Sequence, residues 1–411
     1  KRKIHSCYCL LLFESMLPEV KSPAGLPKTD PESIIHSARV RDYIFSKIDL
    51  AGGSISFAEY MHDALYAPGL GYYVAGMTKF GRNGDFVTAP EVSHLYGRVL
   101  ANQCAQILDS IPNGSILEVG AGTGILAITI LKKLGEIGQL PSSYKILEVS
   151  PDLIERQRKN ISMEVPEFNS VVTWIDTLPA DFEGVILANE VADALPFERF
   201  IRTKSDVLEV GVTYSDKNFI YQMRPAKDQL KESVLNIENQ LDARLAEGYS
   251  SEVSLTLEAW GRDLITSLNH GILLVLDYGL GMRDYYHSER DQGWIRCHYK
   301  HHAHEEPLIF PGIQDITSWV NFSILARVAI QCGAKISGFT NQSNFLINSG
   351  LEKEFVNFKH LSTRDQLTLS KEIKVLTLPS EMGENFKCLG IQKGNLPVIN
   401  AFSNGNRSHI L

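Results

Sequence analysis

The sequence has 411 residues, of which 44% are hydrophobic and 21% charged, and its formal net charge is −8. This balance is typical of a globular protein and excludes collagen-like, coiled-coil and wholly disordered chains. The acidic charge also argues against a protein that coats nucleic acid, because neutralising phosphates requires clustered cations. No apolar run reaches the roughly 20 residues needed to cross a bilayer. We therefore expect no nucleic-acid partner and no membrane insertion.

Residues 1–33 are predicted to be a flexible lead-in, because much of the segment is rich in proline and polar residues. Its start, KRK before a short apolar run, superficially resembles a signal peptide, but Glu14 interrupts the run. A start at Met16 and a short transit peptide are two further interpretations. Six scattered cysteines make no disulfide framework and indicate a reducing compartment. We expect a cytoplasmic protein, with the mitochondrial matrix as the alternative.

Residues 34–115 are predicted to form an N-terminal cap region. An amphipathic helix is expected over 34–50 and a buried helix over Leu95–Leu108. The stretch between them, 51–94, is rich in glycine, tyrosine and proline and reads as loop, where binding residues often lie.

From residue 116 the sequence alternates between strands and helices. Five strands are expected, at 116–119, 144–149, 171–175, 184–188 and 272–276. Helices are expected at 125–134 and 151–160. This alternation predicts an α/β fold, a doubly wound parallel sheet with helices on both faces.

An inserted subdomain, 206–266, is predicted to interrupt this domain, which would comprise 116–205 and 267–395. The insertion begins with an expected antiparallel pair over 206–225, turning at 215–218, and continues with a helical stretch over 227–247. Late strands are expected at 335–339 and 386–391, and 396–411 is expected to be a tail.

The segment ILEVGAGTG is the strongest local signal. A strand runs into Gly120, Gly122 and Gly124 and then directly into a helix. Glycine suits a tight turn that a ligand approaches closely, and the helix N-terminus offers free N–H groups to an anionic group.

Three ligands are candidates for this loop. A dinucleotide fingerprint would need glycine where Ile125 stands, and the phosphate-loop pattern is absent. The G-x-G-x-G form with the acidic Glu118 two residues before it fits S-adenosylmethionine (SAM) best. A glycine-rich turn without a ligand is the alternative.

Two later acids extend the expected donor site. Glu148 ends the second strand, where a carboxylate can accept hydrogen bonds from both ribose hydroxyls. Asp176 ends the third strand and is expected to accept from the adenine amino group. A solvated acid at a strand end is the alternative for each.

The fourth strand ends in NEVADALP, beyond the sheet edge where ligands bind. If a helix begins there, Glu190 and Asp193 share one face. With Asn189, they are the candidate catalytic residues, because paired carboxylates can hold a cationic nucleophile and accept its proton. Helix capping by Asn189 with a solvated Asp193 is the alternative.

Histidines crowd the segment CHYKHHAHEE, at 298, 301, 302 and 304. They lack a cysteine pair or a His-Glu-x-x-His arrangement, and adjacent histidines rarely serve one tetrahedral centre. No metal is expected.

Several phrases occur in one order: GDFVTAPEVSHLYGRVLANQ, ILEVGAGTG, ILEVSPDL, ANEVADALPFERF, LVLDYG and CHYKHHAHEEPLIFPGIQDIT. Together they resemble the MidA-like SAM-dependent methyltransferases over about residues 35–395. The mitochondrial members of that family are complex I assembly factors that methylate arginine in a quinone-side subunit.

The resemblance implies a class I methyltransferase fold, SAM as cofactor and a protein substrate, possibly a quinone-oxidoreductase subunit. It carries over the loop glycines and Glu148 as donor-binding positions. It also implies that the segment before the fold lines the cleft, with matching residues Gly84, Asp85, Phe86, Thr88, Pro90 and Glu91. A small-molecule methyltransferase and a non-catalytic SAM-binding chaperone are the alternatives.

The sequence departs from the family at two positions. Thr123 stands where mitochondrial members often carry arginine, and Asn321 stands where many members have aspartate. These departures leave the acceptor and the chemistry of Asn321 open.

Overall fold

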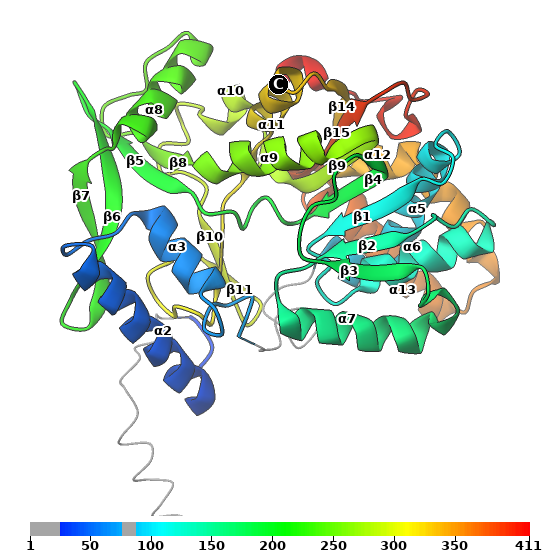
Figure 1. The fold of residues 1–411 in the computed structure, drawn as a ribbon, viewed down its shortest axis with the longest axis horizontal. Helices are drawn as coiled ribbons and strands as arrows, with labels where there is room; N and C mark the ends of the chain where they lie inside the picture. The colour runs from blue at the N-terminus through cyan, green and yellow to red at the C-terminus, as the bar shows by residue number, and fades with distance from the viewer. Residues whose placement is uncertain (1–24, 76–87) are drawn as a thin grey trace, which may run out of the picture.

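The computed structural model describes residues 25–75 and 88–411, and Figure 1 shows that they form two lobes. One lobe is built on a large sheet and the other on helices α2 (Pro31–Leu50) and α3 (Phe57–Tyr66) with two smaller sheets. Within these residues no helix is both long enough and apolar enough to cross a membrane.

The large sheet has the order β14-β15-β9-β4-β1-β2-β3, with β13 paired to β9. Its strands are β1 (Ser115–Val119), β2 (Tyr144–Leu147), β3 (Val172–Ile175), β4 (Phe182–Asn189), β9 (Leu268–Leu280), β13 (Val320–Asn321), β14 (Lys335–Asn341) and β15 (Phe386–Lys393). All neighbours are parallel except β15, which runs antiparallel to β9 and β14. This arrangement confirms the expected α/β class I methyltransferase sheet, including both late strands.

Strand order reverses between β1 and β4, because β2 and β3 continue on one side and β9 on the other. In a doubly wound sheet, ligands bind beyond the carboxyl ends of the strands at such a switch point. The fold therefore directs attention to the loops that follow β1 and β4.

Helices cover both faces of the large sheet. Ile116 packs into one hydrophobic core and its neighbour Leu117 into another, because successive strand residues point to opposite faces. The first core contains α5 (His94–Leu108), α6 (Ile125–Glu136) and α12 (Gln342–Asn348), with α7 (Pro151–Glu164) beside them; the second contains α9 (Leu255–Ser267) and α11 (Phe322–Gln331).

The second lobe holds a four-stranded antiparallel sheet of order β7-β6-β5-β8 and a three-stranded sheet of order β11-β10-β12. The strands are β5 (Glu198–Arg202), β6 (Val207–Ser215), β7 (Asn218–Pro225), β8 (Ser250–Val253), β10 (Arg296–Tyr299), β11 (His302–His304) and β12 (Asp315–Thr317). Side chains of α2 and α3 share a core with Val212 of β6 and Ile316 of β12. Residues far apart in the sequence thus form one lobe.

The remaining elements are short, apart from α8 and α13. They are α4 (Ala89–Val92), α8 (Asp228–Leu241), α10 (Met282–Tyr285), α13 (Thr363–Thr377), α14 (Met382–Asn385) and the 3-10 turns η1 (Pro166–Phe168), η2 (Leu351–Phe355), η3 (Phe358–His360), η4 (Asn400–Phe402) and η5 (Ser408–Ile410).

The insertion is partly as expected. The antiparallel pair is confirmed as β6 and β7, and the turn residues Asp216 and Lys217 have φ values of 49° and 65°, which suit a tight two-residue hairpin. The helical stretch is shorter than expected, because Asp242 takes a left-handed conformation and ends α8. Since the four-stranded sheet already includes β5, we propose that the inserted unit spans 198–253 instead of 206–266.

The interpretation of 51–94 as loop was wrong over α3. Ser56 and Glu59 form a capping box, in which each side chain hydrogen-bonds to the other residue's backbone N–H. This pairing starts a helix inside a segment otherwise rich in glycine and tyrosine.

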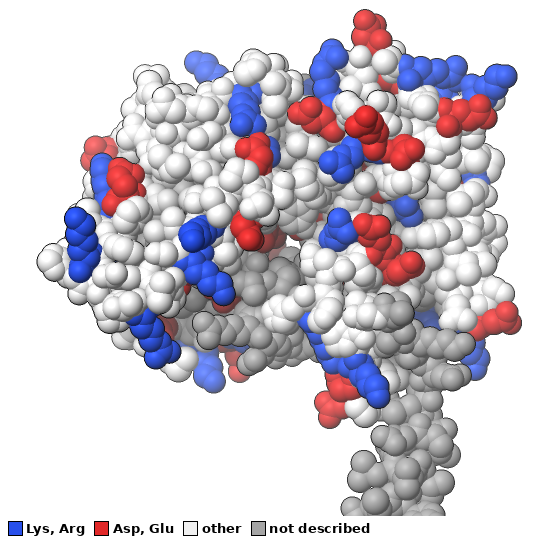
Figure 2. Space-filling model, turned by 180° about the vertical axis from the view of Figure 1, so that it is seen from behind, with Lys and Arg blue, Asp and Glu red and all other residues white. Residues whose placement is uncertain are grey.

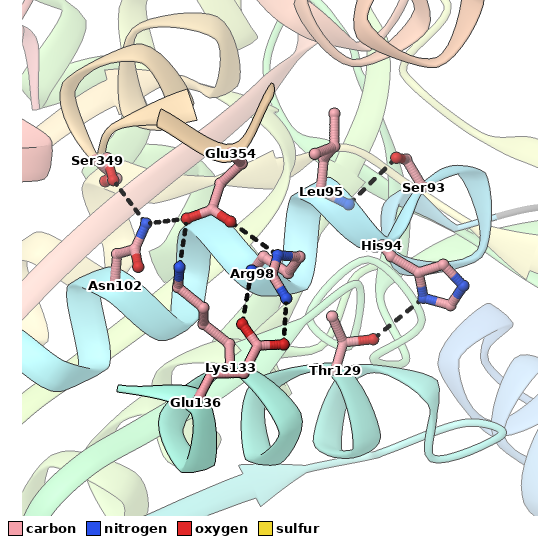
Figure 3. Close-up of polar contacts among 10 residues, drawn as sticks. All are labelled: Ser93, His94, Leu95, Arg98, Asn102, Thr129, Lys133, Glu136, Ser349 and Glu354. Carbon is pink, nitrogen blue, oxygen red and sulfur yellow. Dashed lines mark hydrogen bonds and ion pairs between the residues drawn. The ribbon is translucent and has the colours of Figure 1, made fainter. Parts of the chain in front are cut away.

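A buried carboxylate fixes the helices behind the glycine loop (Figure 3). Glu354 of η2 accepts from Arg98 Nε at 2.7 Å, Lys133 Nζ at 2.8 Å and Asn102 Nδ2 at 2.9 Å. Arg98 also donates two hydrogen bonds to the Glu136 carboxylate, from Nη1 and Nη2. The network joins α5 and α6 to η2, and so holds in place the helix that begins at the loop.

Candidate active site

A cavity of about 320 Å³ lies at the carboxyl ends of β1, β2 and β4. Residues from α3 and the turn after it, from Thr88–Glu91 and from α9 complete its wall. Its volume is in the range of sites that bind small molecules, and its place is the switch point that the sheet order indicates.

The three loop glycines lie where side chains are disfavoured. Gly120, Gly122 and Gly124 have φ values of 65°, 52° and 83°, in the left-handed region that favours glycine. A Cβ atom on Gly120 would lie 3.1 Å from Val191 Cγ2. Gly120 and Gly122 line the cavity, whereas Gly124 caps the start of α6.

Glu118 lies beneath this loop at the end of β1 and lines the cavity. The Tyr144 hydroxyl donates to Glu118 Oε2 at 2.6 Å. Burial raises the pKa of Glu118 to about 7, because an apolar surrounding disfavours the charged form. A nearby cation would restore the charge.

Glu148 follows β2 and is held by its own loop. Its Oε1 atom accepts the N–H groups of Val149 at 2.9 Å and Ser150 at 3.0 Å. Its Oε2 atom accepts from Gln157 Nε2 at 3.0 Å, and the same amide donates to the Gly122 carbonyl at 2.9 Å. Gln157, which the sequence reasoning missed, therefore ties Glu148 to the glycine loop.

The segment after β4 is a turn, so the helix that would put Glu190 and Asp193 on one face does not form. Glu190 has φ 53°, which an α-helix does not allow. Its Oε1 atom accepts from the Ala89 backbone at 3.0 Å and from Asn189 Nδ2 at 3.2 Å, and Tyr96 donates to Asn189 Oδ1 at 2.5 Å. Burial raises the pKa of Glu190 to about 8. Asn189, Glu190 and Asp193 all line the cavity.

Asp193 is supported from β9. Asp277 Oδ2 accepts the backbone N–H groups of Ala192 at 3.0 Å and Asp193 at 3.2 Å. The Tyr278 hydroxyl donates to Asp193 Oδ2. Burial raises the pKa of Asp193 and of Asp277, and the charge of Asp193 raises that of Asp277 further. Asp277 comes directly after the predicted apolar strand 272–276. Its position at a strand end was the only sequence signal that it could lie near the site.

The segment before the large sheet reaches the cavity. Thr88, Pro90 and Glu91 line it, and Thr123 Oγ1 donates to Glu91 Oε1 at 2.6 Å. Asp85, with Gly84 and Phe86, lies outside the described residues. Asp176 is exposed and is not among the lining residues, so its contact with adenine stays a prediction.

Sequence reasoning missed three aromatic residues of the cavity wall. Tyr66 and Tyr73 come from the stretch interpreted as loop, and Trp260 comes from the predicted insertion, on α9. The only signal for Tyr66 and Tyr73 was their place in the segment 51–94, which was interpreted as loop, because binding residues often lie on loops.

Charge in this cavity has one sign. Five carboxylates line it: Glu91, Glu118, Glu148, Glu190 and Asp193. No lysine, arginine or histidine is among the described lining residues. Such a wall attracts cations, and it fits SAM, whose sulfonium and ammonium groups are positive. The histidine segment lies on β10 and β11, and among the described residues no three acids, histidines or cysteines group to hold a metal.

The outer surface is mixed in sign. On the face in Figure 2, the described basic and acidic side chains are interspersed and form no continuous basic surface.

Comparison with known proteins agrees with this geometry. The model of a family described as S-adenosyl-L-methionine-dependent methyltransferase matches residues 99–340. Similar proteins include the mitochondrial protein arginine methyltransferase NDUFAF7 of Danio rerio, 29% identical over 93% of this chain and 92% of that protein. The Drosophila melanogaster homologue is 26% identical over 92% of this chain and 90% of its own length.

Solved structures also resemble the chain. A Burkholderia thailandensis protein crystallised with S-adenosyl-homocysteine is 36% identical, has a TM-score of 0.88, and the match covers 94% of this chain and all of that one. A native structure from the same organism is 35% identical with a TM-score of 0.85, with the same coverage of both chains.

The names of the animal relatives do not support the expected cytoplasmic location, because they place those proteins in mitochondria. The fold, the cavity and the family match agree on the chemistry. This chain belongs to the family of S-adenosyl-L-methionine-dependent methyltransferases.

Proposed function

We propose that this enzyme transfers the methyl group of SAM to a guanidine nitrogen of an arginine in a partner protein. The observation that carries the proposal is the cavity wall with five carboxylates and, among its described residues, no basic side chain. Both the donor and a guanidinium acceptor are cations, which such a wall attracts. The names of the relatives from fish and fly, which are protein arginine methyltransferases, support the same acceptor.

On this proposal the donor lies across the ends of β1 and β2. Glu148 accepts hydrogen bonds from the ribose hydroxyls, since one carboxylate can accept several. Gly120 and Gly122 let the donor approach the backbone, Gly124 starts α6, and Glu118 faces the ammonium group. Thr88, Pro90 and Glu91 close the site beside the loop, where Thr123 donates to Glu91. Asp85 and Asp176 remain further candidates for donor binding.

SAM supplies a methyl group already activated by its sulfonium. The protein has to align the nitrogen, exclude water and take up one proton. Asp193, oriented by Tyr278 and Asp277, holds the guanidinium by charge-assisted hydrogen bonds. Glu190 accepts the proton, because its pKa of about 8 is near the value that suits a general base at neutral pH. Asn189 keeps Glu190 in position.

We further propose a mitochondrial location, the matrix, in place of the cytoplasm. This proposal rests on the names of the relatives. A quinone-side subunit of respiratory complex I, which the family resemblance implies, is the first partner to test.

The direct test is methyl transfer from SAM with a radiolabelled methyl group, using the purified full chain and a mitochondrial extract. We expect label in a protein band, recovered after hydrolysis as methylarginine. Label in small molecules would support a small-molecule methyltransferase instead. SAM binding without label in any fraction would support a non-catalytic chaperone, and either result would overturn the proposal.

A further inference from the structure

Two tyrosines contribute aromatic rings to the cavity wall. Tyr66 is the last residue of α3, and Tyr73 lies in the turn that follows it. Their rings stack with centroids 5.4 Å apart and planes inclined by 20°. Both residues are half-buried, so each contributes aromatic surface to the wall.

Hydrogen bonds at their hydroxyl groups fix both rings. The Tyr66 hydroxyl donates to the Ala194 carbonyl at 3.0 Å, next to Asp193 in the turn after β4. The Tyr73 hydroxyl donates to Asp315 Oδ1 at 2.8 Å. Because each hydroxyl donates its proton to the protein, its oxygen can only accept a further hydrogen bond from a ligand.

Negative charge surrounds these rings. Burial raises the pKa of both tyrosines, and the nearby charges of Asp315 and Asp193 raise it further. The hydroxyls therefore stay protonated at neutral pH. The result is an aromatic wall with acids beside it, whose two hydroxyl oxygens can accept but not donate a further hydrogen bond, which suits a cation with several N–H donors.

A flat cation fits this wall better than a compact one. A guanidinium group can stack on an aromatic ring while its N–H groups reach acceptors in its plane. An ammonium group is a point charge that does not stack and is more strongly hydrated. Asp193 supplies a carboxylate in the same cavity, directly before Ala194, whose carbonyl accepts from Tyr66.

We propose that Tyr66 and Tyr73 are acceptor-binding residues that select arginine over lysine. The acceptor guanidinium lies against the tyrosine pair with Asp193 in reach of its N–H groups. The inference rests on the proposed function and adds to it the residues that recognise the flat guanidinium group of the acceptor.

The experiment uses the full chain saturated with S-adenosyl-homocysteine and three probes titrated by calorimetry: the acetyl-amide derivatives of arginine, lysine and citrulline. Citrulline is as flat as arginine but uncharged, so the three probes separate charge from shape. We expect arginine to bind about tenfold more tightly than lysine, in line with a cation–π contact at a desolvated site. We expect citrulline to bind more weakly still, because it lacks the charge.

Variants test the tyrosines themselves. Tyr66→Leu and Tyr73→Leu remove a ring and are expected to lower arginine affinity about tenfold and to remove the preference over lysine. Tyr66→Phe and Tyr73→Phe keep the ring and are expected to keep most of that preference. Tyr214→Leu is the matched control, because Tyr214 stacks on Phe45 and is not among the described residues that line the cavity.

The affinity for S-adenosyl-homocysteine shows whether each variant is folded. The inference alone would be overturned if the wild type bound the arginine and lysine probes equally. It would also be overturned if both leucine variants kept their S-adenosyl-homocysteine affinity and bound the arginine probe as tightly as the wild type does. A wild-type chain that does not bind S-adenosyl-homocysteine would overturn the proposed function instead.

Discussion

The proposed donor side and the proposed acceptor side of the cavity are built in different ways. The donor side comes from β1, β2 and the loops directly after them, within residues 115–153. The acceptor side combines Tyr66 and Tyr73 with Asp193, and behind them Asp315 and Tyr278. The donor side is therefore specified by one continuous stretch of sequence, whereas the acceptor side forms only when distant segments pack together.

The largest effect should follow from filling the glycine loop. Gly122→Val places a β-branched residue at φ 52° on the cavity wall, where such a side chain is strained. We expect the affinity for S-adenosyl-homocysteine, measured by calorimetry, to fall more than about 100-fold. Gly138→Val is the control, since Gly138 also has a positive φ but has open space around it. Equal losses in both variants would mean that the loop acts only through folding.

The next largest effect concerns the acid between the two sides. Glu190→Gln should lower the rate of methyl transfer roughly 100-fold, the usual effect of removing a general base. The exposed residue Glu155 on α7 provides the matched control, Glu155→Gln. A variant at Glu190 that turns over at the wild-type rate would exclude this residue as the base.

The same variant has a distinct pH signature in stability. The folded protein raises the pKa of Glu190 from 4.5 to about 8, so it binds this proton more tightly than the unfolded chain does. The stabilisation that this tighter proton binding gives to the folded state is fully present below pH 4.5 and is lost as the pH rises through 8. The unfolding temperature of the unliganded protein should therefore fall more steeply between pH 5.5 and pH 8.5 in the wild type than in Glu190→Gln. Parallel curves would show that Glu190 titrates normally.

On the donor side, Glu148→Ala should weaken S-adenosyl-homocysteine binding about 10- to 100-fold, because hydrogen bonds to a charged group are each worth about 1.5–3 kcal/mol. Removing the ribose hydroxyls from the ligand should have little further effect in this variant. If the 2′-deoxy ligand loses affinity equally in wild type and variant, Glu148 does not contact the ribose.

A smaller change is expected at Trp260, the aromatic residue of α9 in the cavity wall. We expect S-adenosyl-homocysteine to quench its fluorescence and Trp260→Phe to lose that signal with a severalfold weaker affinity. Trp294→Phe should keep the quenching, because Trp294 stacks on Trp319 at 4.4 Å and is not among the described lining residues. Quenching that persists in Trp260→Phe would show that Trp260 does not contact the ligand.

The smallest effect belongs to Asp176. Its exposed carboxylate competes with water for any partner, so Asp176→Ala should change S-adenosyl-homocysteine affinity by no more than about threefold. A larger loss would show that this strand end closes over the ligand.

The sequence predicted the strands, the glycine loop and the helix of the proposed donor side well, because their signals are local. Strand, glycine loop, helix and strand-end acid follow one another from Ile116 to Glu148, and each has a fixed place in a doubly wound sheet. The late strands β14 and β15 were also expected from the sequence, at 335–339 and 386–391.

The acceptor side was predicted only in part. Glu190 and Asp193 were expected near the ligand from their position after β4, and both line the cavity, but the helix considered there does not form because a left-handed Glu190 makes a turn. Tyr66, Tyr73 and Asp315 could not be grouped, since nothing local indicates that α3 and β12 share a core. Their meeting depends on long-range packing of the second lobe.

A crystal structure of the chain with S-adenosyl-homocysteine tests the central claim most directly. We expect the ribose hydroxyls at Glu148, the sulfur turned toward Glu190 and Asp193, and open space between the sulfur and the Tyr66–Tyr73 pair. A ligand bound outside this cavity, or a sulfur turned away from both acids, would contradict the account.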